Sequence, residues 1–370
     1  MESSSSFLCC NDLLFEIFSQ CSLKLVDKSK TVSKVCKDIM YEPMFMQYHK
    51  KKTGAIYGYL IQSLYKNNHF SSVVSLDDVI STVSLDFLPR KSQILASTDQ
   101  GIMCCISREN GWRNERFYVC KLMTKQIQML PNPKLRYMTD KVAMVVLESN
   151  PLRYKIIRLS GLETRYVYID HHTYLCEIFD SKTWLWEQSK IMLPLRVLIS
   201  RDSIFVSGSV HWLLSDNRIL AFDVKTTTHT IFSLPHDARV KENEFHTIRL
   251  VKYKGKLGLI KGLGSEFEIW ELENSRTRVW KRIKEINAEA VEKKEPYCVP
   301  QAVGLYSRDV ALMKGRDYIF YNFEDASLSV AKLDHHLTHP NDVFPFRSDL
   351  EPVDLRGLSF ADVLDDIAIA

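Results

Sequence analysis

Five strand–turn–strand units recur along most of the chain, and they constrain the fold more than any other feature. In each unit, aromatic or β-branched residues lead into a polar turn and a second apolar run follows. The units cover residues 117–131, 176–194, 219–235, 267–280 and 318–333. Anchored at Lys121, Asp180, Asp223, Glu271 and Asn322, they recur at intervals of 59, 43, 48 and 51 residues. Intervals of this size are typical of kelch-like propeller blades.

Further strand pairs precede these units. They cover residues 94–107, 203–214 and 248–260 and turn at Gly101, Gly208 and Gly255. A pair plus a unit gives about four strands, which is the content of one propeller blade. The pattern predicts about five blades, and a sixth would fit within residues 71–88. A β-sandwich of meander hairpins is the alternative, because hairpins alone do not distinguish it from a propeller.

The first 50 residues have a different, helical pattern. Leu13, Leu14, Ile17 and Phe18 recur at three- and four-residue steps, which places them on one helical stripe that begins near Asn11. A second stripe runs over residues 25–40 and ends before Pro43, since the residue before a proline is pushed out of the helical region. A unit of this size is too small to support a core alone, so we expect it to pack on a partner or on the rest of the chain.

The ordered residues of this segment resemble an F-box of the large plant families. The resemblance rests on Asp12-Leu13-Leu14, Glu16-Ile17, Val32, Lys34, Pro43 and Phe45. It implies a module that binds a Skp-type adaptor and so delivers a substrate receptor to a cullin-RING ubiquitin ligase. The residues expected to contact the adaptor are Leu8, Leu13, Ile17, Leu25, Val32, Ile39 and Phe45. The chain has Cys9, Ser22 and Cys36 where the family usually has two prolines and a tryptophan.

The β region resembles the F-box-associated domain of plant F-box proteins, over residues 96–104, 118–124 and 208–213 in particular. We therefore predict a mainly β protein with a small all-α N-terminal module followed by a β-propeller-like domain of about five or six degenerate blades. The predicted boundaries are a disordered N-terminus (1–7), an F-box (8–49), a linker (50–70), the propeller-like domain (71–350) and a C-terminal tail (351–370).

Composition narrows the class of protein. Hydrophobic residues make up 45% and charged residues 25%, as in an ordinary folded protein, and a formal net charge of +4 gives no argument for nucleic-acid binding. The nine cysteines have no framework spacing, which favours reduced thiols and a location in the cytoplasm and/or nucleus. The sequence has neither a signal-peptide pattern nor an apolar run long enough for a membrane helix.

Motifs that carry chemistry are absent from the sequence. His335, His336 and His339 lack the glutamate that a zinc protease needs after its first histidine, and the chain has no Cys-x-x-Cys. The basic residues 49–52 are expected to form a solvated face. We therefore predict no catalytic residue, no cofactor-binding residue and no metal ligand.

The resulting hypothesis is a non-catalytic substrate receptor whose partners are a Skp-type adaptor, a cullin-RING ligase and a protein target. Two alternatives stay open. One is a propeller-type enzyme or small-ligand binder with capping helices. The other is an F-box protein that has lost adaptor binding through Cys9, Ser22 and Cys36.

Overall fold

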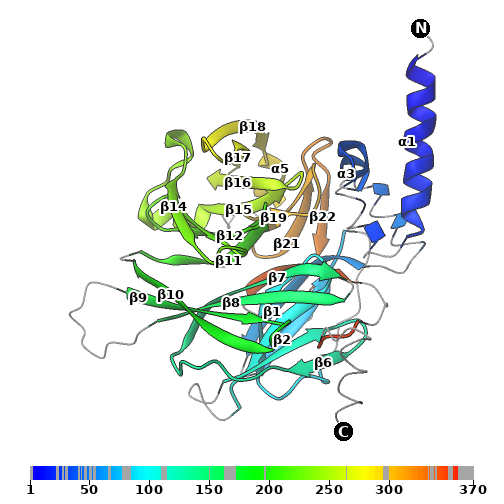
Figure 1. Cartoon of the computed structure of the whole chain (residues 1–370). Coiled ribbons are helices and arrows are strands. Elements are labelled where there is room, and N and C mark those ends of the chain that lie inside the picture. The colour runs from blue at the N-terminus through cyan, green and yellow to red at the C-terminus, as the bar shows by residue number, and fades with distance from the viewer. Residues whose placement is uncertain are drawn as a thin grey trace.

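The structure is a computed structural model of the 370-residue chain. It describes residues 3–21, 25–26, 29, 32–40, 42, 44–45, 48–49, 52, 56–65, 68–76, 85–109, 115–149, 151–161, 172–195, 197–263, 265–294, 300–331, 333, 337, 340–348 and 353–356. Six antiparallel sheets form a ring, and the helices α1 (Ser3–Ser19) and α3 (Lys34–Met40) lie at its side (Figure 1). Within these ranges no helix combines the length and the apolar character that a membrane crossing requires.

Five of the sheets have four strands in sequence order and are called blades 1 to 5. Blade 1 contains β3 (Ser92–Ser97), β4 (Ile102–Ser107), β5 (Arg116–Lys121) and β6 (Gln126–Met129). Blade 2 contains β7 (Thr139–Ser149), β8 (Leu152–Gly161), β9 (His172–Asp180) and β10 (Leu185–Leu195). Blade 3 contains β11 (Ile199–Val206), β12 (Ser209–Leu214), β13 (Arg218–Asp223) and β14 (His229–Ser233). Blade 4 contains β15 (Ile248–Tyr253), β16 (Lys256–Leu263), β17 (Glu266–Asn274) and β18 (Val279–Asn287), and blade 5 contains β19 (Gln301–Leu305), β20 (Val310–Lys314), β21 (Tyr318–Asn322) and β22 (Leu328–Ala331).

Blade 6 joins the two ends of the propeller. Its middle strand β1 (Ile56–Tyr65) pairs with β2 (Asn68–Val74) on one side and with β23 (Pro340–Ser348) on the other, and Ile61 lies opposite Val343. Residues 56–65 were predicted to belong to a linker, but they form β1. The sixth blade was predicted to lie within residues 71–88, but of this range only residues 71–74, the end of β2, are in blade 6. The pairing of β1 with β23 spans almost the whole chain, so no local sequence pattern reveals it.

Six apolar clusters fill the six gaps between neighbouring blades. Phe117 of blade 1 packs with Trp186 of blade 2, and Trp212 of blade 3 packs with Tyr174 of blade 2. The remaining clusters join blades 3 and 4, 4 and 5, 5 and 6, and 6 and 1. Each sheet is thus covered on both faces by different neighbours, which is the packing of a closed six-bladed propeller and excludes the two-layer sandwich.

The burial pattern explains why the middle strands are continuous apolar runs. All six residues of β4 are buried because both faces of that strand meet a neighbouring blade, whereas the outermost strand β18 is mostly exposed. The outer hairpins turn in the same way without glycine. Asp180, Asp223 and Asn322 each accept a backbone N–H two residues on, and a residue with positive φ closes each turn.

The helices differ from the sequence prediction at their N-termini. Helix α1 spans Ser3–Ser19, although residues 1–7 were predicted to be disordered and the helix to begin near Asn11. No proline or glycine precedes Asn11, and extending a helix costs less than nucleating one. Helix α3 spans Lys34–Met40, and the Ser33 hydroxyl accepts the Cys36 N–H at 3.1 Å, so a cap interrupts the predicted second stripe.

Loops between blades carry the helical turns η2 (His236–Ala238), η3 (Glu242–Thr247) and α5 (Glu289–Lys294). Residues 353–356, which were predicted to belong to a separate tail, lie against blades 1 and 2. The Tyr154 hydroxyl donates to the Leu355 carbonyl at 2.9 Å, and Gln126 exchanges hydrogen bonds with the Val353 backbone.

Candidate functional site

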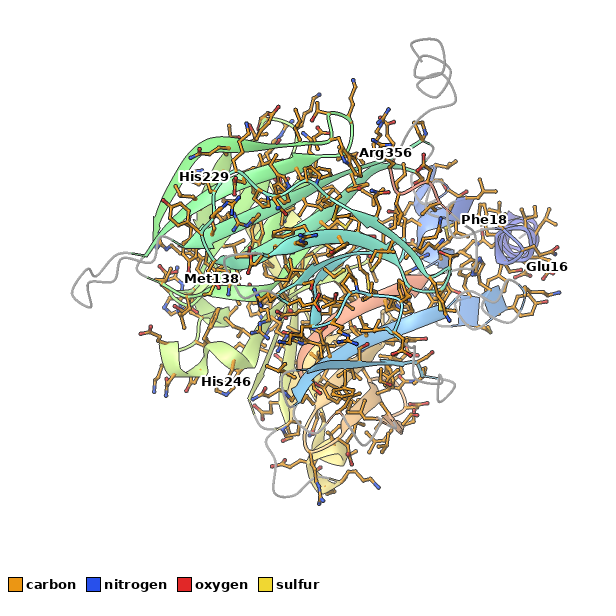
Figure 2. All side chains as sticks on the ribbon, turned by 90° about the horizontal axis from the view of Figure 1, so that it is seen from below. Glu16, Phe18, Met138, His229, His246 and Arg356 are labelled. Carbon is orange, nitrogen blue, oxygen red and sulfur yellow. The ribbon has the colours of Figure 1, made fainter. Side chains whose placement is uncertain are left out.

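The helical module, residues 3–52, has a small core of its own. Val26, Cys36, Ile39, Met40 and Phe45 are buried together, with Leu14, Phe15, Phe18 and Cys21 packed around them. The Phe15 and Phe45 rings meet edge to face at 5.5 Å between centroids. Figure 2 looks along α1 and shows Phe18 on the side toward the rest of the molecule and Glu16 on the outer side.

A second apolar surface of the module faces outward. Leu13 and Ile17, one helical turn apart on α1, are 61% and 48% exposed, and Val32 is 76% exposed. We call the full set the outer apolar surface; its members are Leu13, Ile17, Leu25, Val32, Val35 and Met44. Single exposed apolar residues are ordinary, but six of them within one small module favour a docking site.

The structure divides the predicted adaptor-contacting residues into two groups. Leu13, Ile17, Leu25 and Val32 lie on the outer apolar surface, while the side chain of Leu8 lies outside the described residues. Ile39 and Phe45 are 7% and 0% exposed, so they belong to the core of the module instead of its surface. Sequence periodicity placed Leu13, Ile17, Leu25, Val32 and Ile39 on apolar stripes. Periodicity does not say which side of a stripe a neighbouring helix covers. The predicted adaptor contacts did not include Val35, which lies on the second stripe, or Met44, whose only sequence signal is apolar character within the F-box segment.

A buried histidine joins the module to the propeller. His49 was predicted to lie on a solvated basic face, but it is fully buried. Its Nε2 lies 2.7 Å from the Cys21 carbonyl, which only accepts, so Nε2 carries the proton. Nδ1 then accepts from the Tyr57 hydroxyl of β1 at 3.0 Å. The histidine therefore connects the end of α1 to the middle strand of blade 6.

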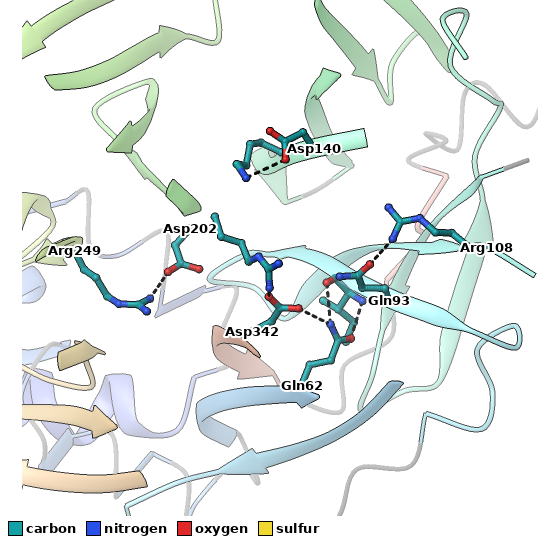
Figure 3. A network of polar contacts seen from close by, with 10 residues as sticks. Gln62, Gln93, Arg108, Asp140, Asp202, Arg249 and Asp342 are labelled. Atoms are coloured by element: carbon teal, nitrogen blue, oxygen red, sulfur yellow. Dashed lines mark hydrogen bonds and ion pairs between the residues drawn. The ribbon is translucent and has the colours of Figure 1, made fainter. Parts of the chain in front are cut away.

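Charged side chains gather where the inner strands of the propeller begin (Figure 3). The inner strands are the first strand of each four-stranded blade, β3, β7, β11, β15 and β19, together with β23. Contacts join them in the order β23, β3, β7, β11, β15 and β19. Arg249 of blade 4 pairs with Asp202 of blade 3, and Arg201 of blade 3 reaches Asp342 of blade 6 on the opposite side of the ring. Asp342 also accepts from Gln62 at 3.2 Å. We call this group the channel cluster; sequence reasoning missed it.

A second cross-channel ion pair lies near the other end. Lys252 of blade 4 meets Asp99 of blade 1 at 2.5 Å, and these blades are also opposite each other in the ring. The sequence did carry a signal for such pairs, because charged residues recur within otherwise apolar first strands: Lys141, Arg201, Asp202, Arg249 and Lys252. In the part of the chain that the structure describes, no group of three His, Cys, Asp or Glu side chains is arranged to hold a metal ion.

Comparisons with known proteins place this geometry in a family. Residues 47–305 match the F-box associated beta propeller domain. An Arabidopsis thaliana protein named F-box protein At5g41720 is 34% identical over 163 residues, which cover 42% of this chain and 87% of that protein. The putative F-box protein At1g53550 of the same plant is 24% identical over 73% of this chain and 69% of its own length, and F-box protein At2g43440 is 25% identical over 74% and 65%. The six-bladed ring, the N-terminal helical module and these matches together show that the chain belongs to the plant F-box proteins with an F-box-associated propeller domain.

Proposed function

We propose that the protein is the substrate-recognition subunit of a Skp–cullin–F-box ubiquitin ligase. The helical module binds a Skp-type adaptor, and the propeller holds a protein target beside the ligase. The chain contributes proximity, which raises the effective concentration of target lysines near charged ubiquitin, and no bond chemistry of its own. The site of action is the cytoplasm and/or the nucleus.

The outer apolar surface is the observation that carries this proposal. A module with its own core has no internal use for Leu13, Ile17 and Val32 at 48–76% exposure. Burying such side chains on a partner removes apolar area from water at roughly 25 cal/mol per Å². The partner expected for an F-box is the Skp-type adaptor, and the family membership of the chain supports that choice.

Position 36 bears on the alternative that adaptor binding has been lost. Cys36 stands where the F-box family usually has tryptophan, and it is 5% exposed within the core of the module. Its small size therefore affects the packing between α1 and α3, while the outer apolar surface keeps its own side chains. This favours a module that still presents a docking surface.

The test is a pull-down of purified Skp-type adaptor by the full-length chain. Ile17→Asp places a charge on the outer apolar surface and is expected to abolish binding. Ile283→Asp is the matched control, because Ile283 is a 36% exposed isoleucine on β18 of the propeller. Point variants are better than removal of residues 1–50, since that truncation also deletes His49, which accepts a hydrogen bond from the Tyr57 hydroxyl of the propeller. Retained binding by Ile17→Asp, or equal loss in both variants, would refute the assignment of this surface.

Small-ligand binding by the propeller is a second candidate function, and the channel cluster favours it. The two functions make different demands on the chain. Adaptor binding depends on the helical module, whereas ligand binding depends on side chains of blades 3 to 6 and is unaffected by Ile17→Asp. If a small ligand stabilised the protein and the adaptor did not bind, only the second function would remain.

A further inference from the structure

The channel cluster contains more hydrogen-bond donors than it uses. Each guanidinium has five N–H donors. In the described structure Arg201 directs one nitrogen to Asp342, and its side chain is 57% exposed. Arg249 directs one nitrogen to Asp202, and its Nε is buried without an acceptor among the described residues. Because a buried N–H without a partner is unfavourable, a bound acceptor would satisfy it.

Tyr318 adds a second, independent observation. It opens β21 in blade 5, its residue is 1% exposed, and its hydroxyl has no hydrogen-bond partner among the described residues. It lies within electrostatic reach of Arg249, Asp202 and Asp342, so the hydroxyl belongs to the same cluster. A buried tyrosine hydroxyl normally finds a partner, and here the group is held ready to donate to one.

Positive charge is in excess at this end of the channel. Lys314 lies opposite Tyr318 in the β20–β21 pair, and burial together with the nearby Arg249 lowers the pKa of its amine. Burial raises the pKa of the Asp202 carboxyl, although a third of its side chain reaches solvent. The positive charges of Arg249, Arg201 and Lys141 act on the same carboxyl and lower its pKa. Among the described residues that these interactions name, the cations are Lys141, Arg201, Arg249 and Lys314, and the carboxylates are Asp140, Asp202 and Asp342.

The groups without partners decide the kind of ligand. Asp202 and Asp342 each accept from an arginine, and no carboxylate oxygen among the described residues is buried without a hydrogen-bond partner, so nothing in the cluster calls for a cation. Two buried groups of the cluster have no partner among the described residues: the Nε–H of Arg249 and the hydroxyl of Tyr318. Guanidinium groups bind carboxylate and phosphate oxygens with two parallel hydrogen bonds. A ligand that satisfies both groups and lowers the excess positive charge is an oxyanion.

We propose that the channel end formed by blades 3, 4 and 5 binds a carboxylate or phosphate group between Arg201, Arg249 and Tyr318. The site lies where the inner strands begin. The helical module joins blade 6 at the opposite end, because Ile56 of β1 pairs with Ser348, the last residue of β23. A ligand there and an adaptor on the module therefore do not compete. The oxyanion has two possible sources. One is an acidic or phosphorylated side chain of a target protein that enters the channel, and this source rests on the proposed function. The other is a free small anion.

Titration calorimetry on the full-length chain at low ionic strength tests the site. The probes are inorganic phosphate, succinate, and short peptides that carry a single aspartate or phosphoserine, with the matching serine peptide as a blank. Saturable binding of at least one oxyanion is expected. Peptide binding at least about tenfold tighter than the free anions would identify a protein source, and equal or weaker peptide binding would identify a free anion.

Variants separate a ligand site from a structural cluster. Tyr318→Phe removes a hydroxyl that has no partner in the described structure, so the ligand-free protein is expected to be equally stable or more stable, while oxyanion affinity falls about fivefold. Arg249→Gln is expected to reduce affinity at least about tenfold. Arg282→Gln is the control, since Arg282 lies on β18, the outer strand of blade 4. Its ion pairs are with Glu268 and Glu285, outside the channel cluster.

Two results would overturn the proposal. One is the absence of saturable binding in every arm. The other is binding by Tyr318→Phe and Arg249→Gln that equals binding by the wild-type chain. The Tyr318→Phe arm decides the matter even if Arg249→Gln fails to fold. Adaptor pull-down by the same proteins reports separately on the proposed ligase function, so failure of one does not imply failure of the other.

Discussion

Replacing Arg158 with leucine is predicted to destabilise the propeller more than most single substitutions. Arg158 of β8 and Glu177 of β9 are 2% and 0% exposed and form an ion pair inside blade 2. Arg158 also donates to the Thr139 hydroxyl at 2.8 Å and to the carbonyls of Leu135 and Tyr137. The ion pair thus joins strands β8 and β9, and Arg158 also binds the segment that connects blade 1 to blade 2.

The magnitude follows from the partner that remains. Arg158→Leu leaves the Glu177 carboxylate buried with only the Leu135 N–H, at 3.0 Å, and leaves two carbonyls without their donor. Removing one partner of a buried ion pair costs about 3–5 kcal/mol. Whole domains have free energies of unfolding of only about 5–15 kcal/mol, so much of the stability would be lost. In the double variant Arg158→Leu/Glu177→Leu the stranded charge is gone, and we expect roughly half of the loss to be recovered.

Urea unfolding followed by tryptophan fluorescence measures both variants. The Arg158 guanidinium lies 5.8 Å from the centre of the Phe117 ring, which contacts Trp186 at 5.3 Å, so the emission of Trp186 reports on this region. Arg282→Leu, on an exposed ion pair, is the control and is expected to stay close to the wild type. A loss below about 1 kcal/mol for Arg158→Leu, or a double variant less stable than the single one, would refute the reasoning.

Three further predictions concern the closure of the ring and its pH dependence. Gly58→Ala is expected to destabilise blade 6 by about 1–3 kcal/mol, because its new Cβ would lie 2.1 Å from the Val74 carbonyl oxygen, while Gly161→Ala, with nothing within 4 Å, stays near the wild type; equal thermal midpoints would contradict this. A chain ending at residue 339 lacks β23 and is expected to lose its cooperative unfolding transition and its resistance to protease, whereas a chain ending at residue 356 keeps both. Burial lowers the pKa of His211 below 6.5, so the unfolded state binds a proton first as the pH falls. The free energy of unfolding is therefore expected to decrease as pH falls through about 6.5. In thermal melts between pH 7.5 and pH 5, His211→Gln should show a smaller decrease in melting temperature than the wild type.

Local patterns were sufficient for the blades but not for their arrangement. Units such as residues 219–235 carry their own strand and turn signals, with Asp223 in place to accept the turn N–H groups, and they form β13 and β14 as expected. The helical module was also recognisable, because Leu13, Leu14, Ile17 and Phe18 repeat at helical spacing. The sequence did not reveal which of these side chains face the core of the module and which face outward, because the position of the neighbouring helix decides it.

The channel cluster shows the same limit more clearly. Arg201 and Asp342 are far apart in the sequence and come from opposite blades, so no pattern of neighbouring residues pairs them. The unpartnered hydroxyl of Tyr318 is invisible in the sequence for the same reason, because its surroundings come from blades 3, 4 and 6.

The sequence by itself determined the elements, the repeat and the family, because turn chemistry, alternation and helical spacing act between residues that are close along the chain. The tertiary structure alone decided how the ring closes, which face of the helical module stays open and which charges meet in the channel. Those contacts join residues from the two ends of the chain or from opposite blades. Their energies depend on burial and distance, which exist only once the propeller has formed.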